Sequence, residues 1–482
     1  MKKNSLLMML YELLGLIVPL ILTPYLSRKL GASGIGLYSY SYSIALYFVI
    51  FIQLGVKLYG KREIAKVNDN TNKYSSVFLE IFIVQVCLFI IVSFVYAGFI
   101  NLGIKIESIK NALVIQGIEL IVGLLDISWF FFGLERFKTI VIRNCIVRIF
   151  EILLVFSFIH ESDDSYIYIL IMAGSNFVGV LSMWLEVRRL VVFRLPKYSS
   201  LKKRVLPLFH LFIPVLSTQI FSIVDKTVIG SVLSVEQVGY YENAYKIAKV
   251  PVVFITSIGN VMLPRVTKLI ADGKIDSSRI YLRKSMTIVI MMTSAIAFGL
   301  AAISNIFIPL YLGPGFKESI ELLTVLPLIL IFIGWGNVLR TQYMLPMGYD
   351  NLYIKSVVYA AISNVVLSVV LVMPFGTLGV AIASLVCEII ICLYTTVKLR
   401  KELPVKSLFN DNCKYLLFGV VMFLVVRIVN HLLNKELNIG QLLLEIAIGS
   451  IVYIGLIISI EKVSGKYILL LEIQNILDGV VN

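Results

Sequence analysis

The chain has 482 residues, of which 59% are apolar and only 15% are charged, and its formal net charge is +14. A soluble globular protein is about half apolar and about a quarter charged. A soluble domain of this composition would expose large apolar patches, so the composition excludes an ordinary soluble protein and indicates an integral membrane protein.

The apolar residues lie in blocks of about 20 residues, the length at which a helix crosses the hydrocarbon core of a bilayer. In chain order, the predicted spans are residues 6–26, 37–56, 77–100, 112–134, 139–159, 166–185, 207–232, 247–263, 286–312, 322–339, 354–375, 377–397, 414–433 and 441–460. Lipid offers the backbone no hydrogen-bond partners, so spans are helices or strands of a closed barrel. The sequence lacks alternating strands of about ten residues. It therefore predicts an all-α polytopic membrane protein with about 14 transmembrane helices.

The distribution of basic residues predicts the orientation of these spans. With the N-terminus placed in the cytoplasm, 32 Lys and Arg residues fall in inner segments and 9 in outer loops, while Arg148 and Lys226 sit inside spans. This asymmetry follows the positive-inside rule and predicts a multi-pass protein of the cytoplasmic membrane with both termini in the cytoplasm. Topology and anionic inner-leaflet lipid account for the net charge, so no nucleic-acid partner is expected.

The first residues and the cysteines narrow the class further. Met1-Lys2-Lys3 leads directly into a full-length span, which we interpret as the first helix and not as a removable signal peptide. None of the five cysteines forms a Cys-x-x-Cys pair. The sequence therefore predicts neither a disulfide framework nor a zinc site.

Two segments resemble each other at a constant offset of 203 residues. Residues 36–45 and 239–248 share Gly, Tyr, Tyr, Ile and Ala, and each block enters a span that follows a proline-containing span. Spans 2 and 8 run in the same direction, so the repeat predicts two parallel six-helix lobes related by an axis along the membrane normal. The predicted parts are an N-terminal lobe (1–187), a basic cytoplasmic linker (188–206), a C-terminal lobe (207–400), and two extra helices with a cytoplasmic tail (401–482).

A few charged residues fall inside the predicted spans, where a charge at a helix centre costs about 2.5–3.5 kcal/mol on insertion scales. They are Glu12, Glu119, Asp126, Arg148, Glu151, Asp225, Lys226, Lys246, Lys249, Arg340 and Glu388. Glu119 and Asp126 are seven residues apart and share a helical face. Arg148 and Glu151 can neutralise each other at a spacing of three. Lys246, Lys249 and Arg340 either face a cavity or extend to the interface. Glu12, Asp225 and Glu388 have no obvious local partner, which favours a functional role.

The motifs that would indicate an enzyme are incomplete or absent in this sequence. Residues 55–62 almost spell a phosphate-binding loop, but the last position is Arg62 where Ser or Thr must hold magnesium, and a transmembrane helix precedes it. The sequence contains neither a Gly-x-Ser-x-Gly nucleophile elbow nor a His-Glu-x-x-His zinc motif. We therefore predict a transporter without a catalytic site, a metal site or a built-in ATPase.

Short motifs from about residue 16 to residue 388 resemble, in the expected order, polysaccharide-unit flippases of the Wzx type. The residues that carry the resemblance include Pro19, Pro24, Tyr25, Ser27, Arg28, Gly31, Gly36, Tyr38, Gly55, Tyr59, Gly60, Lys61, Arg62, Asp225, Lys226, Gly239, Tyr241, Tyr245, Lys246, Pro264, Asn364, Gly376, Gly379 and Glu388. The wider MOP superfamily also contains multidrug exporters of the MATE type and the lipid II flippase. The resemblance implies a two-lobed MATE-like fold with two additional C-terminal helices.

The resemblance also implies a function. Such a flippase moves a polyprenyl-pyrophosphate-linked oligosaccharide from the cytoplasmic to the outer leaflet by alternating access. Cationic residues of the slot would hold the pyrophosphate, and we expect Lys226, Lys246, Lys249, Arg28 and Arg340 in that role. Glu12, Asp225 or Glu388 would carry a coupling proton or sodium ion; no other cofactor is expected. A polysaccharide polymerase and assembly proteins are potential partners. The alternatives are a multidrug or small-molecule exporter and a membrane-embedded enzyme of polysaccharide assembly.

Overall fold

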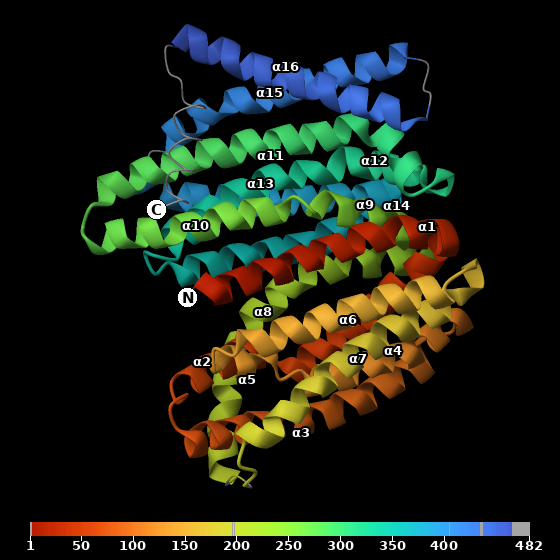
Figure 1. Ribbon diagram of the computed structural model, residues 1–482, viewed down its shortest axis with the longest axis vertical. Helices are drawn as coiled ribbons and strands as arrows, with labels where there is room; N and C mark the ends of the chain where they lie inside the picture. The colour runs from red at the N-terminus through yellow and green to blue at the C-terminus, as the bar shows by residue number, and fades with distance from the viewer. Residues whose placement is uncertain (1, 195, 197, 404, 434–436, 465–482) are drawn as a thin grey trace. The chain divides into compact units, whose positions relative to one another are not determined.

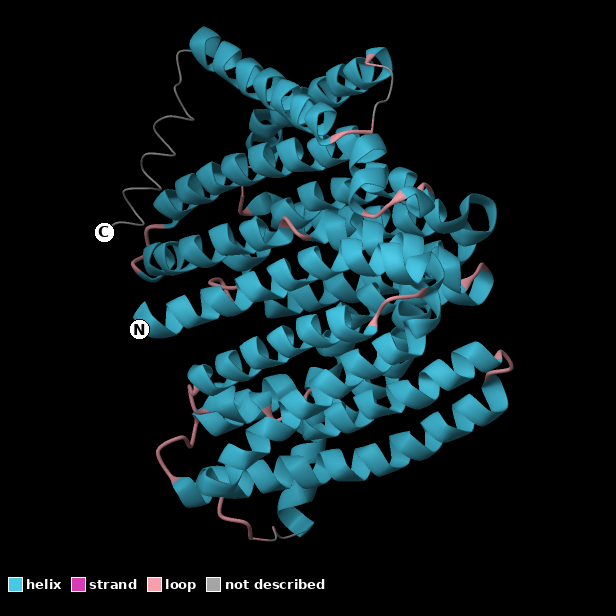
Figure 2. Ribbon diagram, turned by 45° about the vertical axis from the view of Figure 1, so that its right-hand side comes forward, coloured by secondary structure: helices cyan, strands magenta, loops and turns pink. Residues whose placement is uncertain are grey.

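The computed structural model describes the whole chain except residues 1, 195, 197, 404, 434–436 and 465–482. Figure 2 shows helices joined by short loops throughout, and the described residues contain no strand. Ten helical stretches of this part are long and apolar enough to cross a membrane. The prediction of an all-α polytopic membrane protein is therefore confirmed.

Figure 1 labels the helices in chain order. They are α1 (Lys2–Gln53), α2 (Val56–Ala65), α3 (Thr71–Gly103), α4 (Glu107–Leu125), α5 (Ser128–Gly133), α6 (Phe137–Phe158), α7 (Ser165–Leu190), α8 (Tyr198–Val232), α9 (Val235–Lys249), α10 (Val252–Ala271), α11 (Ile275–Tyr311), α12 (Glu318–Val325), α13 (Ile329–Asn337), α14 (Asp350–Lys398), α15 (Val405–Leu432) and α16 (Ile439–Ser464). Single turns of 3-10 helix precede α7, α12 and α13 and follow α14, and a π-helical turn, Val338–Met344, follows α13.

Two of the long helices each contain two predicted spans. A glycine with non-helical backbone kinks each of them, Gly31 in α1 (φ 67°) and Gly376 in α14 (φ 58°). Glycine adopts a positive φ without the steric penalty that a Cβ imposes. These kinks fall where the sequence analysis placed the loop between spans 1 and 2 and the junction of spans 11 and 12.

Helices α6 and α8 coincide with the predicted spans 139–159 and 207–232 but are not among the ten apolar stretches. For α6 the reason is its charge, since it carries Lys138, Arg143, Arg148 and Glu151. The predicted total of fourteen spans therefore stays a prediction.

The chain forms two units, residues 1–242 and 243–482. In the first unit α1 packs against α3, α4, α6, α7 and α8. In the second, α11 packs against α10, α12, α13, α15 and α16. Each unit thus gathers around one long helix that contacts most of its neighbours. The boundaries of the predicted lobes and linker stay a prediction.

The short helices α2 and α5 cross each other in a buried aromatic core of the first unit. Trp129, Phe130 and Phe78 in this core are at most 1% exposed. A Cβ on Gly60 of α2 would lie 2.3 Å from the indole ring of Trp129. Because Gly60 has no side chain, α2 and α5 approach each other closely at the indole ring.

The two glycines of the internal repeat, Gly36 and Gly239, meet in the first unit. A Cβ on Gly36 would lie 1.8 Å from the carbonyl oxygen of Val235, and a Cβ on Gly239 would lie 1.9 Å from that of Ala32. The contact is reciprocal, since each glycine faces the residue four positions before the other. Only residues without a side chain permit such backbone contact between helices.

Candidate functional site

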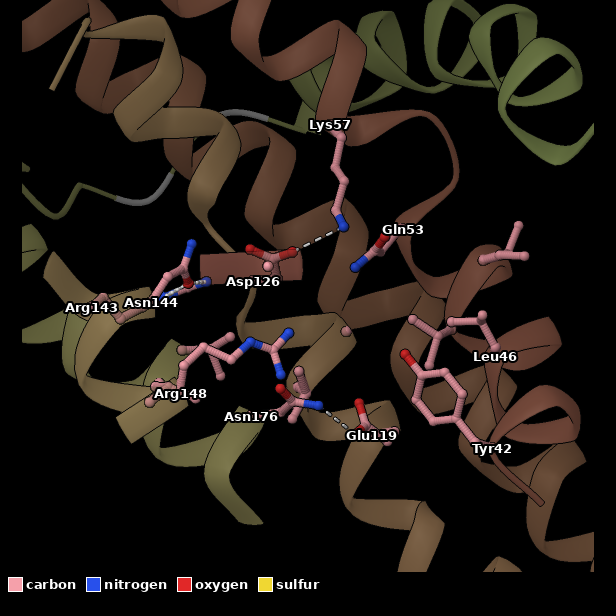
Figure 3. A pocket seen from close by; sticks show the side chains of 18 of the residues that line it. Tyr42, Leu46, Gln53, Lys57, Glu119, Asp126, Arg143, Asn144, Arg148 and Asn176 are labelled. Carbon is pink, nitrogen blue, oxygen red and sulfur yellow. Dashed lines mark hydrogen bonds and ion pairs between the residues drawn. The ribbon is translucent and has the colours of Figure 1, made fainter. Parts of the chain in front are cut away.

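A polar cavity of about 390 Å³ opens among the helices of the first unit. Helices α1, α4, α6 and α7 supply most of its walls, with Lys57 from the start of α2 and Gln219 from α8. Figure 3 shows its charged and amide side chains pointing toward one space. We call Lys57, Glu119, Asp126, Arg143 and Arg148 the cavity cluster. Charged groups are rare among membrane helices unless they face such a cavity, so this is the candidate site.

Lys57 and Asp126 form an ion pair on the wall of this cavity. The ammonium nitrogen of Lys57 lies 3.1 Å from Oδ2 of Asp126, and their side chains are 55% and 14% exposed. The chain reaches Lys57 through a sharp bend, because Leu54 and Gly55 have φ values of 42° and 102°. The bend turns α2 away from α1 and carries the lysine to the cavity.

The other acids of the cavity region are held by hydrogen bonds and a second ion pair. Asn176 of α7 donates through Nδ2 to Oε1 of Glu119 at 2.9 Å. Arg148 pairs with the fully buried Glu151 three residues later on α6. The predicted neutralising pair of Arg148 and Glu151 is therefore confirmed, and the predicted shared face of Glu119 and Asp126 is a wall of this cavity.

Arg143 lies one helical turn and a half before Arg148 on the same helix. Its Nε donates to the amide oxygen of Asn144 at 2.8 Å, and its guanidinium also contacts the sulfur of Met183. Arg143, Arg148 and Lys57 bring three cations to the cavity lining, against two carboxylates, those of Glu119 and Asp126. Glu151 neutralises Arg148 and Asp126 neutralises Lys57, yet these cations still line the cavity, where they can bind the oxygens of an anionic ligand.

Two predicted site residues, Asp225 and Lys226, lie elsewhere in the first unit, where side chains of α8 bond to side chains of α9. The hydroxyl of Tyr241 donates to Oδ2 of Asp225 at 2.6 Å. Lys226 pairs with Glu242 at 2.8 Å, and these two side chains are 13% and 8% exposed. We call these four residues the α8–α9 cluster. Asp225 and Lys226 thus both have bonding partners on α9, Tyr241 and Glu242, which were not expected from the sequence.

The remaining predicted residues of the first unit are Arg28 and Glu12. Arg28 is exposed on α1, one turn before the kink at Gly31. Glu12 belongs to α1, but its side chain lies outside the described residues. The roles expected for both residues stay predictions.

The second unit contains Lys246, Lys249, Arg340 and Glu388. Lys246 and Lys249 lie in the last turn of α9, where the ammonium of Lys249 sits 5.3 Å from the ring centre of Tyr245. The positive charges of Lys249 and Arg340 are near enough to act on the carboxyl group of Glu388 in α14. The functional roles of all four residues stay predictions.

Arg340 also borders a smaller cavity of about 250 Å³ at the π-helical turn Val338–Met344. Its guanidinium donates to the hydroxyl of Tyr353 at 2.9 Å and stacks 5.1 Å from that ring. Tyr349, on the rim, donates to Glu402 at 2.9 Å, and this hydrogen bond raises the pKa of its phenol. The arginine is therefore oriented by the aromatic ring beside it.

Sequence reasoning missed Lys57, Arg143 and Asn176 as lining residues. Lys57 lies in the rejected phosphate-loop pattern, and Arg143 lies inside the predicted span 139–159 but was not among the charged residues named there. A signal for Arg143 was available, because a charge inside the predicted span 139–159 is itself unusual. Asn176 carries no charge and gave no signal.

The fold and the charged cavity define a polytopic membrane transporter. A family model described as polysaccharide biosynthesis protein matches residues 1–270, more than half of the chain. The chain therefore belongs to this family.

Relatives of the chain are described as transporters and flippases. It is 24% identical over 387 residues to a proposed O-antigen transporter of Escherichia coli (strain K12), covering 80% of this chain and 92% of that protein. It is 21% identical over 170 residues to a proposed flippase of low-salt glycan biosynthesis from Haloferax volcanii, covering 34% of each chain. These relatives confirm the prediction of a transporter and not an enzyme.

Solved structures confirm the fold. The lipid II flippase MurJ in an inward closed conformation superposes with a TM-score of 0.74 at 17% identity, covering 96% of this chain and 99% of that one. An inward-facing multidrug resistance MATE transporter of the MOP superfamily gives a TM-score of 0.60 at 15% identity, covering 79% and 94%. The predicted MATE-like fold is therefore confirmed.

Proposed function

We propose that this protein is a flippase for a lipid-linked oligosaccharide. The observation that carries the proposal is the charged cavity of the first unit, set among helices that are otherwise apolar. Family membership and the relatives named above support it. A cavity of this kind has no use in a purely structural membrane protein, since each intramembrane charge is costly to insert.

The chemistry of the substrate explains the need for such a cavity. Sugar hydroxyls and phosphate groups lose several kcal/mol each when they leave water without new hydrogen-bond partners. Amides such as Asn144 and Asn176 can replace water around hydroxyls, and Lys57, Arg143 and Arg148 can bind phosphate oxygens. The lipid tail needs no such partners and can stay in the bilayer.

The finer proposal concerns direction and energy. The substrate is a polyprenyl-pyrophosphate-linked repeat unit that moves by alternating access from the cytoplasmic to the outer leaflet of the cell membrane. Either an ion gradient or consumption of the product by a polymerase would make transport directional. For a coupled ion, the membrane potential alone contributes about 2.3 kcal/mol per elementary charge per 100 mV. The protein's termini would lie in the cytoplasm, as the distribution of basic residues indicates.

A reconstituted assay tests the proposal. The purified chain is placed in vesicles with a polyprenyl-pyrophosphate oligosaccharide that bears a fluorophore on its sugar, and an impermeant quencher is added outside. We expect label of the inner leaflet to become accessible only when the protein is present. A phospholipid with the same fluorophore should stay protected. Equal protection of the oligosaccharide with and without protein would overturn the proposal.

A pair of variants links this assay to the cavity. Arg143→Gln removes a lining cation and should slow exposure of the label. Arg136→Gln is the matched control, because Arg136 is accessible, pairs with Glu186 at 2.9 Å and does not line the cavity. Equal rates in both variants would show that the substrate does not use this cavity.

A further inference from the structure

The two partners of the Lys57–Asp126 ion pair differ in solvent exposure. The lysine side chain is 55% exposed, whereas the aspartate is only 14% exposed and faces the same cavity. An ion pair whose lysine is exposed is weakened by solvent and by competing anions. This pair is therefore easy to break, and its position on the cavity wall places it where a ligand can break it.

Each partner is held in place without the other. Asp126 ends α4, and its second oxygen, Oδ1, accepts a hydrogen bond from the backbone N–H of Ser128 at 3.1 Å. The backbone before Lys57 is fixed where Gly55 packs against α8, because a Cβ there would lie 2.8 Å from the carbonyl oxygen of Leu208. Release of the lysine would therefore leave Asp126 bonded to the start of α5 and α2 anchored to α8.

We infer that Asp126 is an internal competitor that occupies Lys57 until the phosphate or pyrophosphate group of the ligand displaces it. This inference rests on the proposed function and adds a residue that sets selectivity for the charged head. The ammonium of Lys57 exchanges one carboxylate oxygen for phosphate oxygens. A pyrophosphate carries more negative charge than a carboxylate and wins this exchange, whereas a neutral sugar does not.

The arrangement has two consequences for transport. The empty cavity presents a neutral pair in place of an uncompensated lysine, which lowers the cost of keeping this charge beside apolar helices. The bound anion must overcome Asp126, so the carboxylate weakens binding and hastens release. Asp126 thereby reduces retention of the anionic head at the end of the transport step.

A thermodynamic cycle of binding measurements tests the inference on the purified full chain. The probes are inorganic pyrophosphate and farnesyl pyrophosphate, which share the charged group and differ in the lipid. The variants are Asp126→Asn, Lys57→Gln and the double variant. Asparagine keeps an oxygen that can accept from Ser128 and removes only the charge, so the variant should stay folded.

We expect Asp126→Asn to tighten binding by about fivefold, the equivalent of the upper range for an accessible ion pair. Lys57→Gln should weaken binding, and Asp126→Asn should add no gain in the Lys57→Gln background. Glu186→Gln is the matched control, because Glu186 pairs with Arg136 away from the cavity and should not change binding. Unchanged or weaker binding in Asp126→Asn, or an equal gain without Lys57, would overturn the inference.

The two probes separate this inference from the proposed function. If farnesyl pyrophosphate shows the expected pattern of affinities across the variants, the result supports a lipid-linked ligand. If only inorganic pyrophosphate shows it, the result supports a soluble anion that binds at the same ion pair. If neither probe shows the cycle while the vesicles still expose labelled oligosaccharide, the role of Asp126 is wrong and the flippase function stands. If the cycle holds but no oligosaccharide moves, the flippase function fails and the competition stands.

Discussion

The cavity cluster and the α8–α9 cluster each contain a lysine, an aspartate and a glutamate in the same apolar unit, yet they differ in their surroundings. In the α8–α9 cluster both members of the Lys226–Glu242 pair are largely buried, and Tyr241 covers Asp225. In the cavity cluster Lys57 is more than half exposed and the side chains border open space.

The difference shows that a charge within an apolar helix is weak support for a transport site by itself. A buried ion pair holds two helices together, and moving either partner leaves a charge in a medium that solvates it poorly. A pair beside open space can exchange partners with a ligand. The comparison predicts opposite outcomes for substitution. Variants of the α8–α9 cluster should destabilise the protein, whereas variants of the cavity cluster should slow transport and leave stability nearly unchanged.

The largest effect should come from Gly239→Ala, at the helix crossing beside the α8–α9 cluster. Its new Cβ would meet the carbonyl oxygen of Ala32 at 1.9 Å, and backbone cannot move aside as a side chain can. We expect loss of monodisperse protein in size-exclusion chromatography. Gly174→Ala in α7 is the control, because no atom lies within 4 Å of that Cβ. A normal elution profile for Gly239→Ala would contradict the close crossing.

The next effect is the loss of one partner of the buried ion pair. Lys226→Met would leave Glu242 as a buried charge, at a cost of about 3–5 kcal/mol. Thermal unfolding in detergent should show a clearly lowered Tm. Lys226→Met combined with Glu242→Gln should recover most of the loss, because the buried carboxylate charge that Lys226 compensates is then gone. A Tm equal to that of the unsubstituted protein would place Lys226 with the cavity residues.

The sequence predicted the helical membrane fold well because hydrophobic block length follows directly from bilayer thickness. It also predicted the Arg148–Glu151 pair, whose partners are one turn apart. It could not give Lys57–Asp126 or Glu119–Asn176, whose partners come from different helices and meet only through packing. The same limit explains Asp225, which lacked an obvious partner in sequence and has Tyr241 in the structure.

The smallest effect on stability should come from Glu119→Gln in the cavity cluster. Glu119 accepts a hydrogen bond from Asn176 at 2.9 Å, and a glutamine oxygen can accept the same bond, so we expect a change of no more than about 1 kcal/mol in unfolding free energy. Exposure of labelled oligosaccharide in the vesicle assay should nevertheless slow, because the substitution removes a carboxylate charge from the cavity lining. If Glu119→Gln lowers Tm as much as Lys226→Met and leaves transport unchanged, the two clusters have the same structural role.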